Sequence, residues 1–110
     1  MNNKKDIENI FKIPELNKFD GDEFFNTILK KGNLKIERIV SKPFFNSDAH
    51  WYDQESDEWV LLLSGTAKIE FEDEIKTLIS GNYLFIPSHK KHRVIDTRGT
   101  SPCIWLAIHF

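Results

Sequence analysis

Short apolar runs, separated by glycine, asparagine or proline, recur along this chain at spacings of about ten residues. The cleanest alternation spans residues 66–72, where Ala67, Ile69 and Phe71 alternate with polar or charged side chains and therefore share one face. No stretch with helical periodicity is long enough to form the core. The pattern predicts an all-β sandwich or barrel, and it does not choose between these topologies.

The same pattern predicts eight strands. The last of them is apolar on both faces, so we expect it in the middle of a sheet. Between the first two strands, the sequence Lys-Lys-Gly-Asn at residues 30–33 favours a hairpin turn. The predicted strands are residues 24–29, 34–41, 59–63, 66–72, 75–79, 83–86, 91–96 and 103–110.

The first part of the chain has no regular pattern. Apolar residues between positions 10 and 25 are spaced irregularly, and Pro14 and Gly21 interrupt any long helix. We expect this segment to be extended with a short turn, and to lie over the barrel or against a second subunit. The expected organisation is one domain, residues 1–110, with a mobile N-terminus (1–9), a lead-in with the first strand (10–33) and a barrel core (34–110).

Arg38 is the exception in the strand predicted at residues 34–41. It shares a face with Leu34, Ile36 and Val40, while the other face carries Lys35, Glu37 and Ile39. If the more apolar face is inside, Arg38 enters a cavity or pairs with a carboxylate. If the strand is bulged, Arg38 reaches solvent. We favour a solvent-exposed or structural role.

Composition supports one folded domain and excludes some partners. The chain has 110 residues, 40% of them hydrophobic, with nine Phe, three Trp and two Tyr to fill a core. Fifteen basic and 17 acidic residues give a net charge of -2, and the longest basic runs are two-residue pairs. Nucleic acid and membrane surfaces are therefore not expected as partners.

Cys103 is the single cysteine, so an internal disulfide is excluded. It lies in an apolar run, where the interpretation as a small buried hydrophobe is favoured over a reactive thiol. No charged start leads into an apolar segment of the signal-peptide or membrane-span type, which gives a cytoplasmic location as the expectation. Neither a nucleophile elbow nor a glycine-rich phosphate loop is present.

Candidate chemistry is concentrated in two stretches, each next to a predicted buried strand. Residues 50–65 collect potential ligand and acid–base groups before an apolar run that ends at Ser64-Gly65: these groups are His50, Asp53, Glu55, Asp57 and Glu58. Residues 81–92 begin with the turn Gly81-Asn82, continue through a short strand to Pro87, and then carry His89 and His92. Carboxylates and imidazoles are thus expected around one opening of the barrel.

The spacing in these stretches resembles the cupin superfamily. Its first motif ends in Glu, six residues and Gly, which Glu58 and Gly65 match; its second runs Gly, five residues, Pro and then His, which Gly81, Pro87 and His92 match. The resemblance implies a double-stranded β-helix, the jelly-roll barrel. It also implies that Glu58 and His92 are metal ligands, as a carboxylate and an imidazole suit a divalent first-row metal.

One part of the cupin pattern is missing. Cupins usually place His-x-His three or four residues before the Glu, where this chain has Tyr52 and Gln54, or Trp51 and Asp53. Asp53 could supply a third, oxygen ligand with Glu58 and His92, and the metal would then be Fe, Mn or Zn. The alternative is a buried Glu58–His92 ion pair without metal.

Other candidates complete the predicted site. His89 and Tyr52 are the candidates for moving protons, His50, Gln54 or Arg38 could join the site, and His109 is expected to be structural. The aromatic side chains of Trp51, Tyr52 and Trp105 could line a pocket, although core positions are favoured.

The function expected from these observations is a cupin barrel whose pocket takes a small polar molecule, either as a divalent-metal enzyme or as a non-catalytic binding or dimerising module. We also expect a homodimer, because the lead-in and the last strand carry more apolar surface than one small barrel buries.

Overall fold

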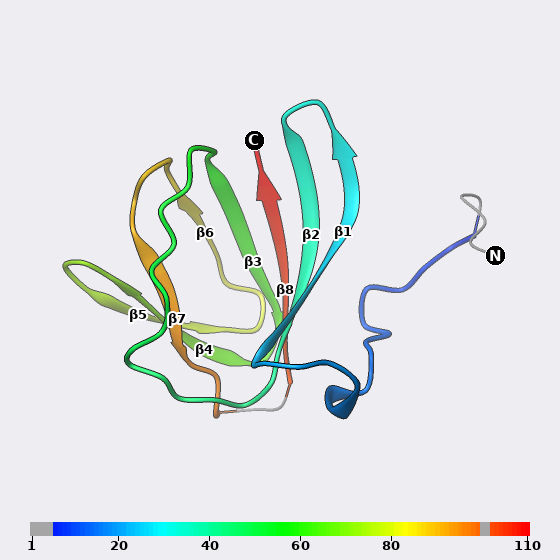
Figure 1. Ribbon diagram of the computed structural model, residues 1–110, viewed down its shortest axis with the longest axis horizontal. Helices are drawn as coiled ribbons and strands as arrows, with labels where there is room; N and C mark the ends of the chain where they lie inside the picture. Colours follow the sequence, from blue (N-terminus) through cyan, green and yellow to red (C-terminus); the bar gives the residue numbers. More distant parts are fainter. Residues whose placement is uncertain (1–5, 100–101) are drawn as a thin grey trace.

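The computed structural model describes residues 6–99 and 102–110 and is almost entirely β-structure (Figure 1). The predicted all-β jelly-roll barrel is confirmed, and a short 3-10 turn, η1 (Leu16–Lys18), interrupts the lead-in. The expectation of mobility for residues 1–5 lies outside the described residues. No helix in the described part of the chain is long and apolar enough to cross a membrane. The strands are β1 (Glu23–Lys31), β2 (Leu34–Ser41), β3 (Glu58–Ser64), β4 (Thr66–Phe71), β5 (Ile75–Ile79), β6 (Tyr83–Ile86), β7 (His92–Asp96) and β8 (Cys103–His109).

The strands form two antiparallel sheets. One has the order β1-β2-β8-β3-β6 and the other the order β5-β4-β7. In Figure 1, β8 runs between β2 and β3, which confirms the central position predicted for the last strand. The register pairs Glu58 with His109 and His109 with Lys35, so these three residues lie at one end of the larger sheet, whereas Ser41 pairs with Glu23 and with Cys103 at the other end.

Side chains from both sheets share one core. Val60 and Leu62 of β3 are buried, and so are Ala67, Ile69 and Phe71 of β4, as the alternation predicted. Trp105 and Ala107 of β8 complete the contact between the sheets. Burying a side chain such as Leu62 contributes about 1.5–3 kcal/mol, so this interleaved set holds the sheets face to face.

Two glycines of the motifs are needed for their turns. Gly65 separates β3 from β4 with φ 112°, and Gly81 separates β5 from β6 with φ 91°. Residues that carry a side chain rarely adopt these backbone angles, whereas glycine adopts them without steric cost. The motif glycines therefore mark the turn after β3, the strand that begins at Glu58, and the turn before β6, which precedes His92 in the chain.

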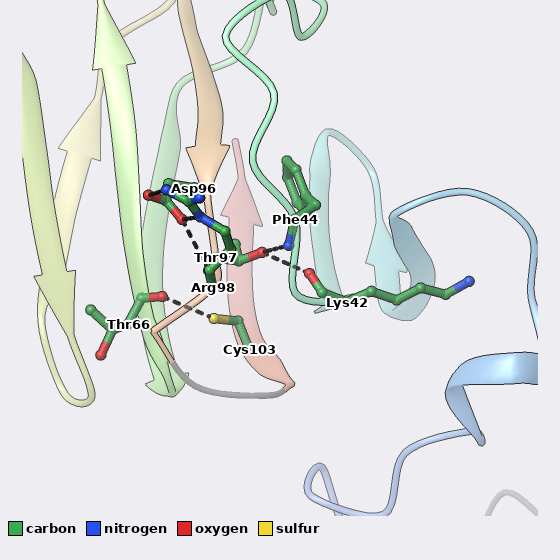
Figure 2. A network of polar contacts seen from close by, with 7 residues as sticks. All are labelled: Lys42, Phe44, Thr66, Asp96, Thr97, Arg98 and Cys103. Carbon is green, nitrogen blue, oxygen red and sulfur yellow. Dashed lines mark hydrogen bonds and ion pairs between the residues drawn. The ribbon is translucent and has the colours of Figure 1, made fainter.

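A polar network closes the barrel end near Cys103 (Figure 2). The buried Thr97 hydroxyl donates to the Lys42 carbonyl (2.6 Å) and accepts from the Phe44 N–H (3.0 Å), which ties the loop after β2 to the end of β7. The Cys103 thiol is also buried and donates to the Thr66 carbonyl (3.3 Å). These contacts agree with the structural interpretation of Cys103.

Arg38 fixes the lead-in to the outside of the barrel. Its Nε donates to Asn26 Oδ1 (2.9 Å), and its Nη1 donates to the carbonyls of Ile10 (3.0 Å) and Lys12 (2.9 Å). The favoured structural role is therefore correct, with amide and carbonyl oxygens as partners. The opposite face of β2 follows as the interior face, and it carries Glu37.

Candidate functional site

A cavity of about 470 Å³ lies between the two sheets. It extends from the end of the larger sheet that holds Glu58 and His109 toward the end that holds Glu23. Its volume is within the range of about 300–1,000 Å³ usual for small-molecule sites. The lining residues are Glu23, Phe25, Lys35, Glu37, Ile39, Tyr52, Gln54, Glu58, Val60, Ile69, Ile86, His92, Val94, Trp105 and His109.

Glu58 and His92, the two side chains that the cupin resemblance places in one site, meet in this cavity. Each is the first residue of its strand, both are buried, and His92 Nε2 lies 3.4 Å from Glu58 Oε1. The other ring nitrogen, Nδ1, lies 2.9 Å from the Lys90 carbonyl and so donates to it, which directs Nε2 at the carboxylate. Gln54 Nε2 donates to the same Oε1 at 3.2 Å. Both described contacts of the carboxylate are thus made by Oε1.

The pKa of His92 is raised above its ordinary value. Burial alone would lower it, but the hydrogen bond with Glu58, the bond to the Lys90 carbonyl and the negative charge of Glu58 together outweigh burial. The imidazolium is therefore held against Glu58 to a higher pH than a solvent-exposed histidine would be.

A second carboxylate–imidazole pair, Glu37 with His109, lines the same cavity. His109 Nε2 lies 2.8 Å from Glu37 Oε1, and Lys35 Nζ lies 3.6 Å from Oε2. Burial would raise the pKa of Glu37, yet the hydrogen bond from His109 and the charges of Lys35 and His109 lower it. Glu58 stands opposite His109 in the β3–β8 register, so the two pairs are neighbours.

Sequence reasoning missed the Glu37–His109 pair and treated His109 as structural. A pattern in the sequence could have indicated it. His109 shares the parity of Trp105 and Ala107 in β8, which places all three on the interior face. Glu37 shares the parity of Ile39, which lines the cavity from β2.

Tyr52 covers the first pair. Its backbone forms a bridge with His92, with N–H to carbonyl distances of 2.8 and 3.1 Å, and the two rings stack with centroids 5.9 Å apart. Burial raises the pKa of the Tyr52 phenol, and the charges of Glu23, Glu37 and Glu58 raise it further. Its hydroxyl therefore remains a proton donor near three carboxyl groups.

Asp53 and His89 lie together outside the cavity lining. Their side chains, 43% and 64% exposed, form a 2.7 Å contact between Asp53 Oδ1 and His89 Nδ1. The His89 backbone has φ 63° and donates its N–H to the Gln54 carbonyl at 2.7 Å, which joins the two motif loops. His50 contacts the Tyr52 ring edge-on and also lies outside the lining.

The opposite end of the cavity holds a directed relay of hydrogen bonds. Trp105 Nε1 donates to Ser41 Oγ (3.0 Å), and the Ser41 hydroxyl donates to Glu23 Oε2 (3.0 Å). Burial raises the pKa of Glu23; the Ser41 bond opposes this rise, and the charge of Asp22 adds to it.

The residues brought together do not match a three-ligand metal centre. Among residues 6–99 and 102–110, no three side chains of His, Cys, Asp or Glu are grouped so that they could hold one ion. Glu58 and His92 contact each other directly, and the interior positions of the expected histidine pair are Tyr52 and Gln54. A catalytic zinc site usually has three protein ligands, so this donor set does not fit the customary centre.

Comparisons with known proteins agree with this fold. The family model described as a cupin domain matches residues 42–109, more than half of the chain. A solved structure from Ralstonia eutropha JMP134, a protein whose proposed activity is mannose-6-phosphate isomerase, is 38% identical, with 94% of this chain and 96% of that chain covered and a TM-score of 0.82. Among curated protein sequences, none is similar enough to count as a relative.

Two further structures share the fold at lower identity. A cupin superfamily protein from Desulfitobacterium hafniense DCB-2 is 18% identical, with 100% and 94% of the two chains covered and a TM-score of 0.73. Iron(II) HppE is 17% identical with a TM-score of 0.73, and this chain, 81% covered, spans 50% of that longer chain. With its motif spacings, its two-sheet barrel and the family match over residues 42–109, the chain belongs to the cupin family.

Proposed function

We propose that this cupin binds a small hydroxylated carbonyl compound, an aldose or ketose, in the cavity between its sheets and isomerises it by acid–base chemistry. The observation that carries the proposal is the buried Glu58–His92 pair, which faces a cavity of about 470 Å³. The 38% identical protein with a proposed mannose-6-phosphate isomerase activity supports the reaction class. Carboxylates such as Glu23 and Glu58 are suitable acceptors for sugar hydroxyl groups.

In this proposal Glu58 is the base. Its Oε1 is engaged by His92 and Gln54, so Oε2 takes the proton from the carbon beside the substrate carbonyl. The raised pKa of His92 favours the imidazolium form beside Glu58, and the contact between the two side chains holds the carboxylate in place. Tyr52, protonated at neutral pH, donates a hydrogen bond to a substrate oxygen from the cavity wall.

The test measures exchange of a carbon-bound hydrogen of the sugar for deuterium in deuterated water. We expect the protein to incorporate deuterium at carbon 2 of D-mannose or D-mannose 6-phosphate and to form the matching ketose, both followed by proton NMR. Glu58→Gln should lower both rates by about 100-fold or more, the usual contribution of general acid–base catalysis. The matched control is Glu55→Gln at an exposed position of the same loop, which should leave both rates unchanged. Sugar-induced thermal stabilisation without exchange would overturn catalysis and favour the non-catalytic binding module.

The divalent-metal enzyme is the second candidate, because Glu58 and His92 already lie together at the predicted ligand positions. It requires Asp53 to leave His89 and join them. The same exchange assay decides between the two. We expect activity to survive prolonged EDTA treatment; loss with EDTA, recovery with Fe(II), Mn(II) or Zn(II), and lower metal content in Asp53→Asn would support the metal enzyme instead.

We also propose that the protein forms a homodimer. Aromatic side chains gather on β6 and the C-terminus, where Tyr83 is 66% and Phe110 51% exposed, and Phe85 packs against Phe110 with ring centroids 6.3 Å apart. Burying such a patch against a second copy removes apolar surface from water. Sedimentation at micromolar concentration should give twice the chain mass, and Phe85→Asp should shift it to the monomer; a monomeric wild-type protein would contradict the proposal.

A further inference from the structure

We infer that the Glu37–His109 pair is a second proton-transfer group of the same site, which moves the oxygen-bound proton while Glu58 moves the carbon-bound proton. This inference rests on the proposed function, since it assigns a further catalytic residue to that reaction. It concerns a pair that the cupin motifs do not include.

The placement of the pair supports a chemical role. Glu58 and His109 are direct partners across β3 and β8, and both side chains line the cavity. Directly opposed side chains on one face of a sheet have Cβ atoms about 4.5–5.5 Å apart. A substrate that touches Glu58 is therefore within reach of His109.

Its burial also argues against a purely stabilising role. Glu37 and His109 are both 8% exposed, and the desolvation of a buried ionic pair often cancels its attraction, so such a pair adds little net stability. The lowered pKa of Glu37 keeps its carboxyl group ionised. The Glu37 carboxylate holds His109 through Nε2, which leaves Nδ1 as the ring nitrogen that can exchange a proton with a ligand.

Isomerisation of a hydroxy-carbonyl compound needs two proton movements. Glu58 removes the proton from the carbon beside the carbonyl, that electron pair forms the carbon–carbon double bond, and the carbonyl oxygen takes a proton from His109. The resulting enediol returns the proton of its other hydroxyl to His109, and Glu58 returns its proton to the former carbonyl carbon. One C–H bond breaks and one forms, and no oxidant or reductant is required.

Glu58 moves the carbon-bound proton and the Glu37–His109 pair moves the oxygen-bound proton, so variants of the two should affect exchange and isomerisation differently. With D-mannose or D-mannose 6-phosphate in deuterated water, His109→Gln and Glu37→Gln should slow ketose formation more than they slow deuterium entry into the recovered aldose. We expect the ratio of exchange to isomerisation to rise at least about tenfold in both variants. Glu58→Gln should lower both rates together, and a residue that only supports the fold would not change their ratio.

The outcomes separate the two proposals. An unchanged ratio in folded His109→Gln and Glu37→Gln overturns the role of this pair and leaves the function of Glu58 standing. No exchange and no ketose with wild-type protein overturns both. The wild-type protein gives a second measurement, independent of how the variants fold: saturating sugar should shift the ring NMR signals of His109 together with those of His92, with the exposed ring of His89 as control. An unmoved His109 signal also overturns the inference.

Discussion

Replacing Trp105 by alanine should lower the free energy of unfolding by about 3–5 kcal/mol, the usual cost of removing a large buried aromatic side chain. Trp105 is 2% exposed and belongs to the core between the sheets. Its indole also donates to Ser41, which in turn donates to Glu23 in the cavity. The substitution therefore removes apolar contacts and releases the relay that positions a cavity carboxyl group.

Urea unfolding measures this effect, with the slope compared between variants to establish that only stability has changed. Trp105→Phe is the matched control, because it keeps most of the ring volume and removes the N–H donor. It should cost about 1–3 kcal/mol, the penalty for one lost buried hydrogen-bond partner. A loss below about 1 kcal/mol in Trp105→Ala would contradict the central position of this side chain.

The strands could be predicted because two signals agree on their positions: the alternation of apolar and polar residues within them, and the turn-forming residues between them. In β4, Ala67, Ile69 and Phe71 alternate with outward polar side chains, and the structure buries all three. Glu58 and His92 could be predicted for a related reason. Each begins a strand whose next inward positions are apolar, so parity alone sends both side chains to the interior.

The Glu37–His109 pair could not be predicted from the sequence of β2 alone, because this sequence does not show which face of the strand points into the barrel. By composition alone, the more apolar face, which includes Val40, would be the interior face. In the structure this face instead lies on the outside of the barrel, where Arg38 binds the lead-in. The cavity instead receives the face with Glu37. A cavity with a polar lining departs from the rule that apolar faces point inward, and such departures are typical of binding sites.

Loop positions were harder to predict than strand positions. Asp53 and Gln54 are adjacent, and the sequence favoured Asp53 as a site residue, yet Gln54 contacts Glu58 while Asp53 contacts His89. A strand has a period that assigns alternate residues to opposite faces, whereas a loop has none. The turn at His89, with its positive φ, contacts both neighbours, since its backbone N–H donates to the Gln54 carbonyl and its ring contacts Asp53. These contacts join segments distant in sequence, so no local pattern predicts them.

Glu23→Gln should make the protein more stable at neutral pH and leave its stability nearly unchanged in acid. Burial raises the pKa of Glu23 above the 4.5 of an unperturbed carboxyl, so the folded state holds this proton to a higher pH than the unfolded state does. The stability that this group contributes is therefore complete below pH 4.5 and is lost as the pH rises through the folded pKa. Glutamine keeps an oxygen to accept the Ser41 hydrogen bond and carries no charge, so the variant does not lose this stability as the pH rises.

Thermal unfolding of the wild-type protein and Glu23→Gln from pH 4 to 8 should show stability curves that separate above about pH 4.5. The exposed control Glu15→Gln should follow the wild type throughout. Equal or lower stability of Glu23→Gln at pH 7 would mean that the ionised Glu23 carboxylate has a compensating partner in the cavity.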